Sequence, residues 1–153
     1  MKKLLIFLAV TMLVAAFALT ACAKPEIVDN PPGMTPEETV EKFFGYWSEK
    51  NLSGMNSLLG GAYNDNPLDK ITFHKQKSIE LISCEEDAEK PDWDDESAQN
   101  WFRDPYDCAS VTTRFIATVR PGSILTKGEH MYRFFLVKES AESDWMIVMY
   151  GAG

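Results

Sequence analysis

The spacing of apolar residues predicts that the folded part of the chain begins with an amphipathic helix. Val40, Phe43, Phe44 and Trp47 recur at positions i, i+3, i+4 and i+7, which places them on one stripe of a helix. Just before them, Thr35-Pro36-Glu37-Glu38 has the order of a capping box with proline at the first helical position. We therefore predict a helix from Thr35 to about Asn51 whose aromatic stripe packs against another element.

A second short helix is predicted from Ser53 to Leu59, where Gly60-Gly61 stops it, and the apolar period then changes to two. The alternation predicts strands over residues 78–85 and 110–120, and two more strands are predicted over residues 131–137 and 144–150. The first alternation is interrupted at Ile82, and the third segment is apolar on both faces apart from Arg133, which is typical of a central strand. Helices followed by antiparallel strands predict one α+β domain over residues 35–153, with the helix pair packed on one face of the sheet.

The N-terminal segment has the layout of a secretory signal. Lys2 and Lys3 precede an uncharged apolar run that ends in small residues before a cysteine. The run is also borderline in length for a permanent membrane helix. Its end, Leu19-Thr20-Ala21-Cys22, resembles the lipobox of bacterial lipoproteins, in which the cysteine receives a diacylglyceryl group and becomes the mature N-terminus.

These features predict an anchored, exported protein. Residues 1–21 would be a signal peptide, Cys22 would carry the fatty acyl groups (palmitate in type), and residues 22–34, rich in proline, would be the lipidated N-terminus and tether. Two or more acyl chains give stable anchoring where one does not. The expected location is the extracytoplasmic face of the cell membrane.

The charge of the chain disfavours nucleic-acid partners. Loss of Lys2 and Lys3 lowers the basic count from 15 to 13 against 23 acids, so the formal charge changes from −8 to −10. Such a net charge is repelled by phosphate backbones and by anionic lipid headgroups. Solubility alone is also a sufficient explanation for the acidity.

Two cysteines remain once Cys22 carries lipid. Outside the cytoplasm Cys84 and Cys108 could form a disulfide. Closing that loop would contribute about 3–4 kcal/mol to stability. Two plain core thiols are the alternative, and we predict the disulfide.

Two stretches carry a resemblance to a known superfamily. TPEETVEKFFGYWSEKNLSGMNSLL resembles the opening helix pair of the nuclear transport factor 2-like superfamily (cystatin-like fold), and GEHMYRFFLVKESAESDWMIVMYGAG resembles its closing hairpin. With the lipobox in front, the chain is similar to a family of clostridial-type lipoproteins whose domain has no assigned function. The resemblance implies a strongly curved sheet that forms a cone with the helices. In some members the cone is a ligand or catalytic pocket, and in others side chains fill it.

The candidate ligand-binding residues are Trp47, His130 and Tyr132. His130 and Tyr132 share one face of a strand, and Trp47 could add an apolar wall from the helix. A histidine could act as a base at neutral pH, but no partner acid can be assigned, so we name no catalytic residue. A strand-end histidine and ordinary core aromatics are the plainer interpretation of the same residues.

The acidic segment 85–107 contains further candidates. Asp92-Trp93-Asp94-Asp95-Glu96 could supply oxygen ligands for calcium, but it lacks the order of a calcium-binding loop. Trp93 and Trp101 could form a lid over the sheet or a contact patch. Residues 97–103 could form one helical turn. We predict no metal ligand and no cofactor.

The pattern as a whole predicts a cell-surface lipoprotein that displays a non-catalytic binding domain for a small molecule, a peptide or an envelope partner. One alternative is an isomerase- or dehydratase-type enzyme that uses the cone as its pocket. The other is a structural or dimerising module of the envelope.

Overall fold

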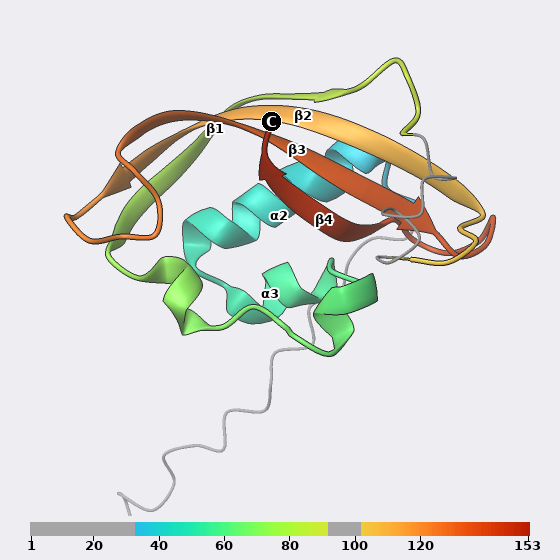
Figure 1. Ribbon diagram of the computed structural model, residues 1–153, viewed down its shortest axis with the longest axis horizontal. Helices are drawn as coiled ribbons and strands as arrows, with labels where there is room; N and C mark the ends of the chain where they lie inside the picture. The colour runs from blue at the N-terminus through green and yellow to red at the C-terminus, as the bar shows by residue number, and fades with distance from the viewer. Residues whose placement is uncertain (1–32, 92–101) are drawn as a thin grey trace, which may run out of the picture.

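The computed structural model describes residues 33–91 and 102–153, which form a four-stranded antiparallel sheet with helices on one face (Figure 1). The strands lie side by side in chain order, β1-β2-β3-β4, so the sheet is a meander. The α+β prediction is confirmed, with β3 central as its two-sided apolar pattern indicated. The elements are α2 (Pro36–Glu49), α3 (Leu52–Ser57), the 3₁₀ turns η1 (Gly61–Asn64) and η2 (Lys70–Phe73), β1 (Gln76–Glu86), β2 (Asp107–Val119), β3 (Gly128–Lys138) and β4 (Met146–Ala152).

Local signals in the sequence set both ends of α2. The Thr35 hydroxyl accepts from the backbone N–H of Glu38 at 3.2 Å, and the Glu38 carboxylate accepts from the Thr35 N–H at 2.8 Å. Pro36 occupies the first helical position, where a missing N–H costs nothing. The helix ends at Lys50, whose φ of 57° is left-handed. The predicted capping box is confirmed.

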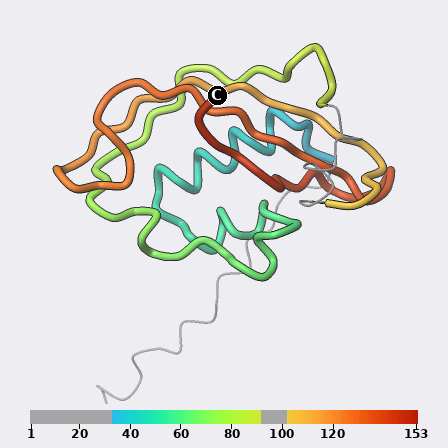
Figure 2. Tube along the Cα trace, viewed as in Figure 1, coloured from blue at the N-terminus to red at the C-terminus, as the bar shows by residue number. Residues whose placement is uncertain are grey.

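The aromatic stripe of α2 fills the space between the helix and the sheet. The Phe43 ring lies 5.6 Å from that of Phe134 on β3, and the Phe44 ring lies 5.1 Å from that of Phe115 on β2. Each of these rings is almost or fully inaccessible to water. Figure 2 shows the helix running beneath the sheet along its length. The core therefore rests on interlocked aromatic side chains from α2, β2 and β3.

The break in alternation at Ile82 is a β-bulge. Leu81 pairs with Phe115, but Ser83 pairs with the adjacent Arg114, so β1 has one extra residue here. The extra residue lets Leu81 and Cys84 both pack against the core although they are three positions apart, while Ile82 is exposed. The irregular pattern in the sequence thus has a structural cause.

The chain after α3 covers the β4 edge of the sheet. Ile147 donates its N–H to the Leu58 carbonyl, and Gly60 donates to the Ile147 carbonyl, both at 2.9 Å. The chain after α3 therefore pairs with β4 as a short parallel bridge.

The outer face of the sheet is the face that points away from the helices. On β2, three polar residues alternate with core residues and therefore belong to this face: Ser110, Thr112 and Arg114. The outer face holds the site described below.

The predicted disulfide between Cys84 and Cys108 is wrong for this structure, in which both thiols are free. Cys84 lies opposite Thr113 of β2 and packs against the core. Cys108 is further along β2 at a position of opposite parity to Thr113, so it belongs to the other face, roughly 17 Å away along the strand. A disulfide needs Cα atoms about 4.4–6.8 Å apart. Burial, with nearby carboxylates, raises the pKa of Cys84 to about 12, so its thiol stays protonated.

Several predictions lie outside the described residues. These are the signal peptide, Cys22, most of the tether, the acidic run 92–96, Trp93 and Trp101, and most of the predicted turn at 97–103. Within residues 33–91 and 102–153, none of the helices is both long enough and apolar enough to cross a bilayer.

Candidate functional site

The three predicted binding residues meet around one buried ring, that of Phe115. The ring centroids of Trp47, His130 and Tyr132 lie 5.5, 5.1 and 5.0 Å from its centroid. His130 and Tyr132 lie on the same face of β3, and Trp47 reaches the same ring from α2. Phe115 itself occupies the space between them, and it is fully buried. They form a packed cluster around this ring.

The polar groups of Trp47 and His130 form hydrogen bonds within the protein. The Trp47 Nε1–H donates to Gln76 Oε1 at 2.9 Å, and Gln76 Nε2 donates to the Trp47 carbonyl at 3.4 Å. His130 Nε2 lies 2.9 Å from the Thr126 carbonyl oxygen. Among the described residues, no carboxylate bonds to His130. The Thr126 carbonyl therefore orients the imidazole.

Two tyrosines that the sequence analysis missed extend the cluster. Tyr150 stacks on Tyr63 of η1 at 6.1 Å and lies 6.4 Å from Tyr132. Burial raises the pKa of all three phenols, most strongly that of Tyr150. They are therefore neutral at physiological pH. Tyr63 falls in a segment that carries no periodic signal, so nothing in the sequence places it beside β4.

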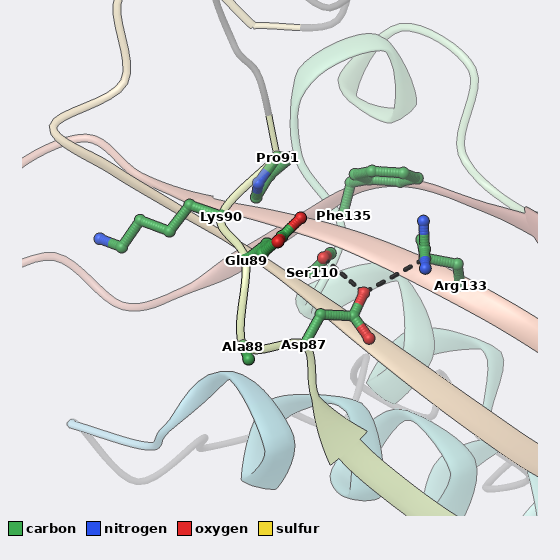
Figure 3. Close-up of a pocket in the computed structure, with 8 residues that line it drawn as sticks. All are labelled: Asp87, Ala88, Glu89, Lys90, Pro91, Ser110, Arg133 and Phe135. Atoms are coloured by element: carbon green, nitrogen blue, oxygen red, sulfur yellow. Dashed lines mark hydrogen bonds and ion pairs between the residues drawn. The ribbon is translucent and has the colours of Figure 1, made fainter.

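A cavity of about 450 Å³ lies on the other side of the sheet, between residues 87–91 and the outer face of β2 and β3. Figure 3 shows the chain after β1 turning back over the two strands to make one wall. Phe135 and Pro91 supply apolar surface, and most of the remaining lining is polar. The lining residues are Asp87, Ala88, Glu89, Lys90, Pro91, Ser110, Arg133 and Phe135.

Asp87 holds this wall on the sheet. Its carboxylate accepts from the Ser110 hydroxyl at 2.6 Å and the Thr112 hydroxyl at 2.8 Å, and it lies 3.2 Å from Arg133 Nε. Its backbone N–H donates to the Ser110 carbonyl at 2.8 Å. Burial alone would raise the pKa of Asp87, but the two hydroxyls and the arginine together outweigh it, so the pKa is lowered. The carboxylate is therefore charged at neutral pH.

The lowered pKa of Asp87 makes the stability of the domain depend on pH. Because the folded state prefers the charged form, the stabilisation is present above the ordinary pKa of about 3.9 and is lost as the pH falls through the lower folded value. We expect Asp87→Asn to lower the unfolding free energy by about 1 kcal/mol at pH 7, and by less at pH values below the folded pKa. Urea unfolding across this range measures it. Asp65→Asn, at an exposed carboxylate, is the control, and parallel profiles for wild type and Asp87→Asn would contradict the assignment.

Arg133 offers the cavity an unused hydrogen-bonding edge. Its Nε faces Asp87, and its two terminal NH₂ groups have no partner among the described residues. The carboxylate of Glu89, on the opposite wall, also has no cation paired with it there. The Lys90 side chain points away from the cavity in Figure 3 and pairs with Asp107. A guanidinium edge and a carboxylate over an apolar wall suit a ligand that carries both charges.

A second, smaller cavity of about 180 Å³ lies on the far side of Arg133. It is lined by Thr112, Met131, Tyr132, Arg133 and Gly153. Arg133 thus separates two hollows on one face of the sheet. The sequence carried a signal for it, since Arg133 is the one charged residue in the apolar run of β3. Asp87 carried none, because it is one acid among many in its segment.

The described residues contain no cluster of three or more His, Cys, Asp or Glu side chains that could hold a metal ion. Among curated proteins and among solved structures, no match to the chain was found. One protein-family profile does match, and it covers residues 37–151, which include the described helices and strands except the first residue of α2 and the last residue of β4. The chain belongs to this family, whose description is "Domain of unknown function (DUF4829)".

Proposed function

We propose that this protein is an exported lipoprotein, anchored through Cys22, whose domain binds a small molecule or short peptide on the outer face of its sheet without catalysing a reaction. The signal-like leader and the lipobox-like junction support the address. The order of helices and strands supports membership of the nuclear transport factor 2-like superfamily. The ring contacts around Phe115 support a cone of the filled kind, so we place the proposed ligand outside it.

The observation that supports the binding site is the cavity beside Arg133. Its volume of about 450 Å³ falls within the range of ligand pockets, roughly 300–1,000 Å³. A hydrogen bond to a charged partner contributes about 1.5–3 kcal/mol, so the free edge of one guanidinium can fix a ligand carboxylate. Phe135 and Pro91 add apolar surface beside that contact.

The lipid anchor is tested by mass. We expect the mature protein from its own envelope to begin at Cys22 and to carry a diacylglyceryl adduct. Cys22→Ala should abolish the adduct and leave the precursor unprocessed, because the thiol that accepts the lipid is gone. A mature wild-type protein without lipid would contradict the anchor while leaving the binding site untouched.

The binding site is tested by a matched pair of arginine variants. Arg133 and Arg114 both lie on the outer face, each pairs with an acid, and each side chain is 53% exposed, but only Arg133 lines the cavity. With tri-alanine as the zwitterionic probe, we expect amide NMR shifts confined to the residues that line the cavity. We expect Arg133→Gln to weaken binding at least tenfold, and Arg114→Gln to leave it unchanged.

The same titration separates the alternatives. Native mass spectrometry of the envelope-purified protein would show whether a ligand co-purifies. Amide NMR shifts around His130 and Tyr132, with none at residues 87–91, would overturn the outer-face site. They would favour the alternative of an enzyme that uses the cone as its pocket. An absence of both a co-purified ligand and peptide-induced shifts would favour the structural module.

A further inference from the structure

Two segments that are far apart in the sequence form one end of the domain. The Arg120 N–H donates to the Lys75 carbonyl at 2.8 Å, and the Ser123 hydroxyl donates to the His74 carbonyl at 3.0 Å. These bonds join residues 70–77, which contain η2, to the β2–β3 turn at 120–127. Figure 1 shows both segments at the left end of the molecule. We call this surface the basic end.

The basic end collects unpaired cations in an otherwise acidic protein. Residues 70–77 and 120–127 contain no Asp or Glu, and none of their Lys or Arg side chains forms an ion pair with another described residue. By contrast, Lys90, Arg114 and Arg133 are each paired with a carboxylate. The cations of the basic end are all exposed: Lys70, Lys75, Lys77, Arg120 and Lys127.

An exposed isoleucine projects from each of the two segments. Ile71 in η2 is 63% exposed, and Ile124 in the β2–β3 turn is 62% exposed. Neighbouring apolar residues, Phe73 and Leu125, pack against the core and anchor the segments. A single exposed apolar residue needs no explanation, but two on joined loops with a cationic rim form a pattern. A soluble anionic partner would need the cations alone.

We propose that the basic end is a membrane-contacting surface that lies on anionic phospholipid, with Ile71 and Ile124 entering the headgroup region. Apolar side chains surrounded by lysines and arginines bind such interfaces through both burial and charge. The surface is separate from the cavity at Arg133 and needs no acyl chain, so the proposal is independent of the proposed function.

The negative net charge does not prevent this contact, because charges act locally in salt. The Debye length is about 8 Å at physiological ionic strength, whereas β3 alone spans roughly 36 Å from the basic end to the β3–β4 turn. Acids near that far turn are therefore screened from a membrane at the basic end. The expectation that the net charge repels anionic headgroups holds for the average surface and not for this one.

The proposed tether is compatible with this orientation. Gly33 donates its N–H to Asp144 in the β3–β4 connection at 3.2 Å, so the tether joins the domain at the end opposite the basic end. Residues 23–34 can extend to roughly 37 Å, about the length of the sheet. A lipid-anchored domain can therefore lie along the membrane and place its basic end on the same surface.

The test uses the chain from Ala23 onward without an acyl group, since every core residue lies between Val40 and Val148. Flotation with vesicles of phosphatidylcholine, with and without phosphatidylglycerol, measures the partition coefficient. We expect binding to the anionic vesicles that weakens at high salt. Each neutralised cation should lower the coefficient about fivefold, so Lys70→Gln with Lys127→Gln should lower it about 25-fold.

Two comparisons make the result specific. Lys42→Gln with Arg103→Gln removes the same charge elsewhere and should have little effect. Ile71→Ser with Ile124→Ser should reduce vesicle binding but not binding to soluble polyphosphate. Equal losses in the two charge variants, no preference for anionic vesicles, or isoleucine variants that bind vesicles like wild type would overturn the proposal. The last result would indicate a soluble polyanion instead. Circular dichroism checks that each variant is folded.

Discussion

Replacing Phe115 with alanine is expected to lower the free energy of unfolding by about 3–5 kcal/mol. The side chain is fully buried and its ring lies 5.1 Å from that of Phe44 and 5.5 Å from that of Trp47. It is thus the point at which the helix stripe meets β2. Removing the ring loses the free energy gained by burying it. It also leaves a cavity that the rigid aromatic neighbours cannot fill.

The neighbouring residue supplies the control. Ile116 lies on the same strand but faces outward and is 40% exposed, so Ile116→Thr should change stability by no more than about 0.5 kcal/mol. Urea unfolding followed by tryptophan fluorescence measures both variants. A loss of less than about 1 kcal/mol for Phe115→Ala would mean that the interior is loosely packed. A ligand site inside the cone would then have to be reconsidered.

The elements that the sequence predicts well are those whose signals are local. The capping box at Thr35 sets the first residue of α2 because both of its hydrogen bonds join residues three apart. Likewise, the sequence predicts β1 and β2 because alternation depends only on which side of the sheet a residue faces, and it predicts β3 because a strand inside the sheet is apolar on both faces. The interruption at Ile82 was visible, and its meaning as a bulge follows only from pairing with β2.

The disulfide between Cys84 and Cys108 was predicted wrongly because it depends on how two strands pair. Cys84 and Cys108 are close enough along the chain for a loop, and the proposed export would place them where disulfides persist. Whether two cysteines on paired strands can meet depends on register and facing, and one residue of slip reverses the facing. The bulge and the turn after β1 set that register, and neither is encoded in the spacing of the cysteines.

The sequence predicts which side chains face inward at the candidate site, but not whether they enclose a cavity. Periodicity correctly placed Trp47, His130 and Tyr132 on inward-facing positions. It does not reveal whether a volume remains between them, because that depends on how Phe115 and its neighbours fill the interior. The outer cavity was missed for the complementary reason: Asp87 and Arg133 are 46 positions apart, and only the returning chain brings them to 3.2 Å.

Replacing Trp47 with alanine is expected to have the second large effect, again about 3–5 kcal/mol. The indole is almost completely buried among Phe43, Phe44 and Phe115. Its Nε1–H also satisfies the Gln76 amide oxygen, which would lose that partner inside the core. Both losses act on the folded state, so urea unfolding should show a lower midpoint with a similar slope.

Conservative variants separate packing from hydrogen bonding at this position. Trp47→Phe keeps an aromatic ring but leaves Gln76 without its donor, so a loss of about 1–3 kcal/mol is expected. Gln76→Leu should cost a similar amount, because it strands the indole N–H. The double variant should cost less than the sum of the two, since replacing both partners by apolar groups leaves no buried group unpaired. Additive losses would mean that the Trp47–Gln76 hydrogen bond contributes nothing to stability.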